Sequence, residues 1–286
     1  YGKSLRTWIK QFEINSIIDF GDLPVFDEAS TYPSIFFLNK RKVNNSKFKA
    51  VVVDTLSFPL GLSYCVQEKS IKVSQNELQE NGWSLVKNDV QDLLQKILGK
   101  GVPLGEYVNG RIYRGVLTGF NEAFIIDTEL KERLISSDPN LSGIIKPFLA
   151  GKDIKRFIKP CSEKWLVFTR RGIAIEQYPA LLVYLEKFKE RLTPKPNDHK
   201  GNWPGRKEGK YKWFEIQDAV DYYEELEKHK IVWPETSLDN QFTFIDSGIY
   251  LNKTTFFIPS NNPDLLGFLN SKLVKFYLNA IVSKMR

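Results

Sequence analysis

The chain has 286 residues, a net charge of +7, and a composition that is 42% hydrophobic and 26% charged. This composition is typical of a globular protein with a hydrophobic core, and it excludes a disordered chain. With only two cysteines and two histidines, widely separated, neither a disulfide framework nor a zinc site is expected, and we assign no metal ligand. The apolar runs are too short to span a membrane, so we expect a cytoplasmic protein with no membrane partner.

The first 60 residues have the pattern of an α/β sheet. A short helix is predicted over 5–12 and strands over 16–20, 33–40 and 48–54, separated by Pro, Gly and Asn. The run VVVD at 51–54 hardly alternates between apolar and polar residues, which is typical of a strand buried on both faces. Three strands are too few for such a sheet. We therefore interpret residues 1–60 as the end of a larger domain whose earlier part is upstream.

Residues 61–105 are predicted to be a connector, because a helix at 90–98 is followed by a segment rich in turn formers. A mixed α+β pattern then runs over 106–286. Paired strands are expected at 111–119 and 122–127, and further strands at 164–169, 211–216, 230–235, 242–246 and 249–259. Helices are expected at 128–136, capped by Thr128, at 175–192, and at 263–282.

The motifs of common enzyme sites are missing from the sequence. The glycine-containing run at 99–105 has the spacing GxGxxxG and contains Pro103, so it does not match a dinucleotide-binding loop. Neither a phosphate-binding P-loop nor a GxSxG nucleophile motif occurs. Asp138, Asp153 and Lys155 loosely match the acidic and lysine pattern of a metal-dependent nuclease, which remains an alternative from a different functional class.

The positive charge is concentrated in the middle of the chain. Residues 151–213 contain 16 Lys/Arg and 7 Asp/Glu, a net of +9, whereas the rest of the chain has a net of −2. Such a concentration favours binding to nucleic acid, although an ordinary solvated basic face is an alternative reading of the charge alone.

Three segments carry the candidate contacts to DNA. Lys152, Lys155 and Arg156 lie in the first, and Arg170 and Arg171 follow a predicted strand in the second. The third is the polar segment 193–213, which we call the basic loop. Its candidate residues are Lys200, Trp203, Arg206, Lys207, Lys210, Tyr211 and Lys212. Lys and Arg bind phosphates and guanine edges, and the aromatic rings are candidates to pack against a sugar or a displaced base.

A family resemblance rests on several of these runs in order. They include RGVLTGFNEAFIID (114–127), WLVFTRRG (165–172), RKEGKYKWFEIQD (206–218) and DLLGFLNSKLVKFYL (264–278). Together they resemble the TaqI-like C-terminal specificity domain of type IIG restriction-modification enzymes and adenine-specific DNA methyltransferases. The stretch IIDFGDLPVFDEASTYPSIFFLNK (17–40) resembles the end of the methyltransferase sheet in the same proteins.

The resemblance implies an α+β fold: a target recognition domain at 106–286, a connector at 61–105, and the terminal strands of a methyltransferase α/β sheet at 1–60. It also implies double-stranded DNA as partner, and an upstream domain that uses S-adenosylmethionine. The family's catalytic and cofactor motifs do not occur in this chain, so no catalytic residue is assigned. Thr118, Gly119 and Asn121 match a turn of the recognition domain, for which we favour a structural role over DNA contact. A specificity module that acts through a separate methyltransferase subunit, as in type I systems, is the alternative arrangement.

Overall fold

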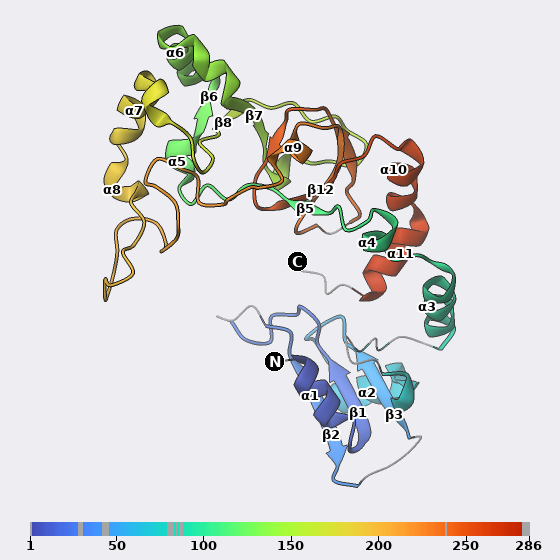
Figure 1. Cartoon of the computed structure of the whole chain (residues 1–286). Coiled ribbons are helices and arrows are strands. Elements are labelled where there is room, and N and C mark those ends of the chain that lie inside the picture. The colour runs from blue at the N-terminus through green and yellow to red at the C-terminus, as the bar shows by residue number, and fades with distance from the viewer. Residues whose placement is uncertain are drawn as a thin grey trace. The chain divides into compact units, whose positions relative to one another are not determined.

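The computed structural model describes residues 2–27, 31–41, 46–78, 83, 85, 88–237 and 239–281. The chain divides into two units (Figure 1). The first unit combines Tyr1–Pro103 with Lys272–Arg286, and the second unit is Leu104–Ser271. Helices and strands are both present in each unit, so the fold is α+β as predicted. None of the described helices has the length and apolar character needed to cross a bilayer.

The first unit is built around a four-stranded sheet with the order β2-β1-β3-β4. Its strands are β1 (Glu13–Asp19), β2 (Ser34–Asn39), β3 (Lys47–Val52) and β4 (Ile71–Ser74). Its helices are α1 (Gly2–Ile9), α2 (Leu62–Lys69), α3 (Asn88–Lys100) and α11 (Lys272–Ile281), with a 3-10 turn η1 at Gln75–Glu77. The central pair β1 and β3 is parallel, and the two outer pairs are antiparallel. Strand β4 lies within the segment that we predicted to be a connector, so part of that segment belongs to the sheet.

Strands β1 and β3 are buried on both faces of this sheet. Ile17 and Ala50 belong to one apolar cluster, and their neighbours Ile18 and Val51 belong to another. For β3, the weak alternation of the sequence at 51–54 predicted this two-sided burial.

Strand β2, by contrast, is exposed at every position. Ile35, Phe36, Phe37 and Leu38 are 40%, 39%, 51% and 38% exposed. β2 lies at the edge of the sheet, pairing with β1 on one side. An edge strand with apolar side chains on both faces is unusual for a free surface.

The second unit contains two further four-stranded sheets. One sheet has the order β10-β9-β12-β5, with β5 (Tyr113–Arg114), β9 (Lys230–Pro234), β10 (Thr243–Ile245) and β12 (Thr255–Ile258). The other has the order β11-β7-β8-β6, with β6 (Ile125–Asp127), β7 (Ile145–Leu149), β8 (Lys164–Val167) and β11 (Tyr250–Leu251). β7 and β11 are parallel, and the other pairs are antiparallel.

Short helices and 3-10 turns surround these sheets. They are α4 (Leu104–Tyr107), α5 (Asn121–Phe124), α6 (Thr128–Ser137), α7 (Pro179–Glu186), α8 (Lys189–Leu192), α9 (Tyr223–Leu226), α10 (Pro263–Leu269), η2 (Pro139–Gly143), η3 (Gly151–Asp153) and η4 (Ile175–Gln177). Figure 1 shows α6, α7 and α8 at one end of the second unit and α10 at the other. A single large core, which includes Leu166, Leu185 and Tyr250, joins the sheets to α7 and α9.

Several predicted elements differ from the structure because tertiary pairing overrides local pattern. The expected strands 111–119 and 122–127 do not pair with each other: β5 pairs with β12, and β6 pairs with β8. Residues 121–124 form helix α5, and the predicted strand 211–216 is a series of turns.

The long helices predicted at 175–192 and 263–282 are both interrupted. The second is broken between α10 and α11 at Asn270, whose side chain is buried and hydrogen-bonds the main-chain N–H and carbonyl of Phe242. The predicted cap of α6 is displaced by one residue, because Asp127, not Thr128, accepts the hydrogen bond from the Leu130 N–H at 2.8 Å.

Candidate nucleic-acid interface

The basic loop follows directly after α8 and extends from it as a long segment without helix or strand (Figure 1). Two main-chain hydrogen bonds close its base: Lys195 N–H to the Arg206 carbonyl at 2.9 Å, and Arg206 N–H to the Thr193 carbonyl at 3.1 Å. Prolines and glycines prevent regular structure between these points, so the loop needs other interactions to hold its shape.

Arg206 supplies most of those interactions and is not available to DNA. Its side chain is buried, with 4% of its surface exposed. Its guanidinium donates hydrogen bonds to five main-chain carbonyls, those of Leu192 (2.7 Å), Thr118 (3.0 Å), Glu215 (2.7 Å), Lys212 (3.2 Å) and Trp213 (2.9 Å). An arginine side chain has five N–H donors, and all five are used here. The prediction that Arg206 contacts DNA is therefore wrong, because its donors organise the loop and the adjacent turns.

Tyr211 is also part of this internal scaffold. Its ring lies 4.5 Å from the Arg206 guanidinium, its side chain is buried, and its hydroxyl donates to the Lys207 carbonyl. Burial lowers the pKa of Arg206 to about 10, although Tyr211 and Glu215 oppose this shift. Arg206 therefore stays charged at neutral pH. Tyr211 is not placed to stack on a base, contrary to prediction.

The tryptophans of the loop serve similar purposes. Trp203 is half-buried; its indole N–H donates to the Thr193 carbonyl at 2.9 Å, and its ring packs edge-to-face on His199. Trp213 packs against the main core beside the buried Phe214. The aromatic residues of this segment thus mainly brace the loop.

Lys195 is half-buried and donates to the Gly201 carbonyl at 2.9 Å, but the other four lysines of the loop have a different environment. Their side chains are exposed, and none is within ion-pair distance of a carboxylate in the described part of the chain. They are Lys200, Lys207, Lys210 and Lys212. The scaffold around Arg206 therefore presents a set of unneutralised cations on a loop of defined shape.

The turn after β8 presents two more cations. Gly172 adopts φ +81° and allows the chain to reverse immediately after Arg170 and Arg171. The Gly172 N–H donates to the buried carboxylate of Glu215 at 2.9 Å. Arg171 donates to the Gln217 carbonyl at 3.0 Å, and the Arg170 guanidinium lies 4.2 Å from the centre of the Tyr223 ring. Both side chains remain exposed.

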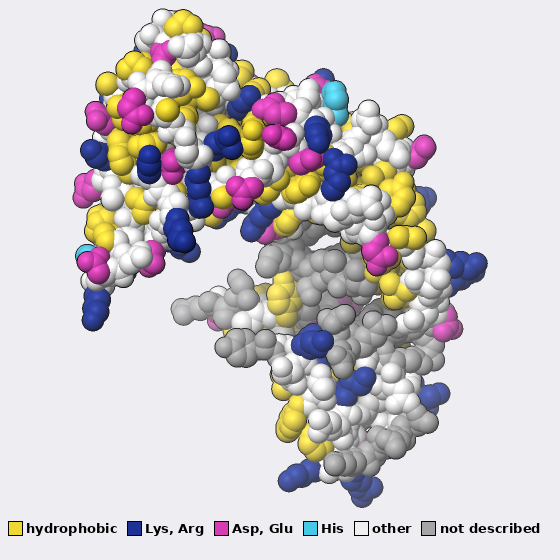
Figure 2. Space-filling view, viewed as in Figure 1, with side chains coloured by type: hydrophobic (Ala, Val, Ile, Leu, Met, Phe, Trp, Pro, Cys, Tyr) yellow, Lys and Arg dark blue, Asp and Glu magenta, His cyan; other side chains and the backbone are white. Residues whose placement is uncertain are grey.

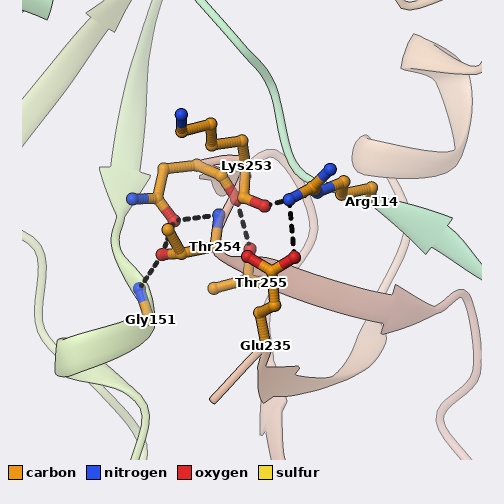
Figure 3. A network of polar contacts seen from close by, with 7 residues as sticks. Arg114, Gly151, Glu235, Lys253, Thr254 and Thr255 are labelled. Atoms are coloured by element: carbon orange, nitrogen blue, oxygen red, sulfur yellow. Dashed lines mark hydrogen bonds and ion pairs between the residues drawn. The ribbon is translucent and has the colours of Figure 1, made fainter. Parts of the chain in front are cut away.

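The segment that holds Lys152, Lys155 and Arg156 is fixed by the polar network of Figure 3. Gly151 donates to the Thr254 hydroxyl at 3.3 Å, and a Cβ at Gly151 would lie 2.8 Å from the Thr254 carbonyl. Lys152 and Lys155 follow in and beyond η3 and are exposed. Arg156 is exposed but donates to the Asn270 carbonyl at 2.5 Å, so part of its hydrogen-bonding capacity is used internally.

Lys253, in the same network, was missed by the sequence analysis. It is exposed, and Figure 3 shows its ammonium pointing away from the network while its carbonyl accepts from Arg114 at 2.6 Å. It lies outside the basic block 151–213, and the hydrogen bond from Gly151 to Thr254 joins its segment to the segment of Lys152.

Ion pairing separates the candidate cations from several others on the second unit. Arg111, Arg114, Lys146, Lys159 and Lys228 each pair with a carboxylate at 2.5–2.9 Å. No such pair involves the exposed candidate cations among the described residues. On the face shown in Figure 2, Lys and Arg side chains lie among Asp and Glu side chains. The absence of an ion pair among the described residues therefore distinguishes the candidate cations better than their place on the surface does.

The turn at 118–121 is structural. The Thr118 hydroxyl donates to the Asn121 side chain at 2.7 Å, and the Thr118 carbonyl accepts from Arg206. Gly119 has φ +82°, and a Cβ there would lie 2.6 Å from the Gln217 side chain. Thr118 is buried, whereas Asn121 is exposed. The geometry agrees with the structural role that we favoured.

The residues of the nuclease alternative are used as local caps. Asp138 is buried and accepts from the Asn140 N–H at 3.2 Å, and Asp153 accepts from the Ala150 N–H at 2.8 Å. Within the described residues, no cluster of His, Cys, Asp or Glu could hold a metal ion. The nuclease alternative therefore has no support from the structure.

Comparisons with known proteins found similar sequences and folds. The chain is 24% identical, over 314 aligned residues, to the type II restriction enzyme and methyltransferase RM.Eco57I of Escherichia coli. The match covers 99% of this chain but 31% of that enzyme, so the chain spans about a third of its curated relative.

Two solved structures are also similar. The type IIL restriction-modification enzyme MmeI in complex with DNA matches with a TM-score of 0.51 and 16% identity, covering 96% of this chain and 33% of MmeI. The type IIG restriction endonuclease BpuSI matches with a TM-score of 0.38 and 13% identity, covering 97% of this chain and 35% of BpuSI.

The family model that matches the chain is described as the TaqI-like C-terminal specificity domain, and it covers residues 146–286. The matched region includes Arg170, Arg171 and the whole basic loop. Residues 146–286 of this chain therefore match the TaqI-like C-terminal specificity domain.

Proposed function

We propose that this chain is the DNA-recognition region of an adenine-specific DNA methyltransferase of the type IIG restriction-modification class. In this proposal residues 106–286 bind double-stranded DNA and position it for methylation by a catalytic domain upstream. The observation that carries the proposal is the set of exposed, unpaired Lys and Arg side chains on turns and a loop that buried polar groups hold in shape, within a specificity domain.

This arrangement suits a polyanion for electrostatic reasons. A cation already paired with a carboxylate must give up that pair before it binds phosphate, whereas an unpaired cation releases only solvent and counterions. Fixed loops also reduce the ordering cost of binding. The lysines would bind phosphates and fix the register of the domain on the duplex. The guanidinium groups of Arg170 and Arg171 are suited to bidentate contacts with phosphates or guanine edges.

The first unit supports the second part of the proposal. Strand β2 exposes apolar side chains on both faces. Such exposure is expected when the neighbouring strand and the helices that cover the sheet belong to another segment. We propose that the upstream catalytic domain continues the sheet at β2. S-adenosylmethionine would be bound by that upstream domain, and we assign no residue of this chain to the cofactor.

A direct test measures duplex DNA binding by the full chain. The triple variant Lys200→Ala, Lys207→Ala, Lys210→Ala removes three unpaired cations from the basic loop while Arg206 is kept to preserve its shape. We expect affinity for duplex DNA at low salt to fall at least tenfold, since each phosphate contact contributes measurably to binding.

A matched control removes the same charge from the first unit. Lys47, Lys49 and Lys72 are exposed lysines on adjacent strands β3 and β4, and their replacement by Ala should leave affinity nearly unchanged. Equal loss in both triple variants would mean that only net charge matters. Undetectable DNA binding by the unaltered chain at low salt would defeat the proposal.

A further inference from the structure

A cavity of about 310 Å³ opens beside the turn that follows β8. Its wall includes Arg170, Arg171 and Lys146, together with the rings of Tyr178, Tyr223 and Tyr250. The volume falls at the lower end of the range for small-molecule sites, roughly 300–1,000 Å³. All of these residues belong to the second unit, so the cavity is formed within one folded body.

Two charged residues that line the cavity, Lys146 and Glu227, neutralise each other. Glu227 pairs with Lys146 at 2.9 Å and accepts a hydrogen bond from the Tyr250 hydroxyl at 2.8 Å. Burial opposes ionisation of Glu227, but these bonds and the charges of Lys146 and Lys230 lower its pKa. The carboxylate is thus ionised and committed to Lys146 and Tyr250.

Arg170 and Arg171, which also line the cavity, form no ion pair with a carboxylate among the described residues. Arg170 has no ion-pair or hydrogen-bond partner for its guanidinium among the described residues, and it is held against the Tyr223 ring at 4.2 Å. Stacking on a ring leaves the N–H edge of a guanidinium free for two parallel hydrogen bonds. Arg171, next to it, donates to Gln217 and retains further N–H donors.

We propose that this cavity binds a single nucleotide unit, with its phosphate on Arg170 and Arg171 and its base against the half-buried rings of Tyr178 and Tyr223, since the ring of Tyr250 is fully buried. Charge selects the phosphate, since Arg170 and Arg171 are adjacent in the chain and neither pairs with a carboxylate among the described residues. Aromatic side chains favour a flat base, and each base stacked on one contributes about 1–3 kcal/mol. The inference deepens the proposed function, because one source of such a unit is a nucleotide displaced from DNA, but a free nucleotide has the same chemistry.

Calorimetric titration of the full chain with a deoxynucleoside monophosphate, inorganic phosphate and the nucleoside without phosphate tests the site. The monophosphate should bind at least tenfold more tightly than either part, since both halves of the cavity contribute. Arg170→Gln should weaken the monophosphate at least tenfold, whereas Arg133→Gln, an equal charge change at an exposed position of α6, should not.

A second pair of variants, at Tyr223, tests the contribution of the tyrosine rings. Tyr223→Phe keeps the ring and should bind like the unaltered chain, and Tyr223→Leu should lose affinity. Thermal unfolding midpoints of all variants establish that they are folded; if Tyr223→Leu is not, the Arg170 pair still decides. Binding of monophosphate that equals binding of phosphate, or that is unchanged in Arg170→Gln, overturns the inference.

Competition then separates the two sources. If duplex DNA displaces the monophosphate and Arg170→Gln weakens both, the nucleotide unit comes from DNA. If DNA and monophosphate bind together, the site takes a free nucleotide. If the chain binds DNA but not the monophosphate, this inference is overturned and the proposed function stands. If the chain binds the monophosphate but not DNA, the proposed function is overturned and the nucleotide site stands.

Discussion

Arg206 and Arg170 are both arginines beside a tyrosine ring, but their surroundings give them opposite roles. All five donors of Arg206 meet main-chain carbonyls in a buried site. Arg170 is exposed and unpaired among the described residues. Both residues are arginines with a basic neighbour in the sequence. Only the three-dimensional environment therefore distinguishes an arginine with a structural role from one that is available to bind a ligand.

This contrast predicts a stability difference between neighbouring positions. Arg206→Ala removes five hydrogen bonds and leaves the carbonyls of Leu192, Trp213 and Glu215 without their side-chain donor, while main-chain N–H groups still donate to those of Thr118 and Lys212. The variant should lower the free energy of unfolding by about 3 kcal/mol or more. Lys207→Ala, next to it and exposed, should change it by less than about 0.5 kcal/mol. Urea denaturation measures both values. An unchanged midpoint in Arg206→Ala, combined with weaker DNA binding, would restore Arg206 as a DNA contact.

Lys230 predicts a pH dependence of stability. It is fully buried at the start of β9, with its ammonium donating to the carbonyls of Asp246 and Ile249 at 3.1 and 3.2 Å. Burial lowers its pKa to about 8, while Glu227 and Asp246 oppose the shift. The unfolded chain keeps the ordinary value of about 10.4, so between these pH values the unfolded state binds more protons.

Stability should therefore rise as pH increases above 8, by up to the order of 2 kcal/mol near pH 10. Above pH 10 the buried tyrosines act in the opposite direction, because burial raises the pKa of Tyr222 to about 12 and the unfolded state ionises first. Denaturation curves from pH 7 to 10 measure the slope. Lys230→Met should flatten it, and an equally steep slope in that variant would contradict this assignment.

At the scale of elements, β2 is the part of the first sheet whose surroundings are incomplete. Its partner β1 is buried on both faces, but β2 exposes apolar side chains on both and forms an edge. Edges of this kind pair with other chains when left open. The strand therefore bears on both self-association of this chain and its connection to an upstream domain.

Phe37→Lys should reduce self-association of the chain, because an edge lysine opposes strand pairing. Phe37 is 51% exposed, so little core packing is lost. Light scattering after size-exclusion chromatography measures the oligomeric state. Leu60→Lys is the control, since Leu60 is 69% exposed but lies outside the strands. Equal behaviour of the two variants would show that β2 is not the associating edge.

At the scale of the whole molecule, the proposal depends on how many cations meet phosphate. The logarithm of the DNA binding constant falls linearly with the logarithm of salt concentration, by about 0.9 for each phosphate contact. Lys200→Ala, Lys207→Ala, Lys210→Ala should therefore reduce the steepness of that line by up to roughly 2.7. Titrations between low and moderate salt measure the slope. Weaker binding with an unchanged slope would point to a change of loop shape, not to lost phosphate contacts.

The predictions from sequence succeeded where one local pattern controls one structural feature. Two-sided burial of β3 follows from its continuous apolar run, and the turn at Gly119 follows from its residue types. They failed where the deciding contact is distant in sequence. Strand β5 pairs with β12, and the break between α10 and α11 depends on Asn270 binding Phe242.

The sequence by itself determined the α+β class, the resemblance to a specificity domain and the location of the positive charge, because composition and ordered motifs are linear properties of a chain. Only the tertiary structure decided which cations are free. Arg206 and Tyr211 became the internal support of the basic loop, while the lysines around them stayed exposed. The physical reason is that a charge is available to a ligand only after the fold has satisfied its own buried carbonyls, and those carbonyls come from segments far apart in the sequence.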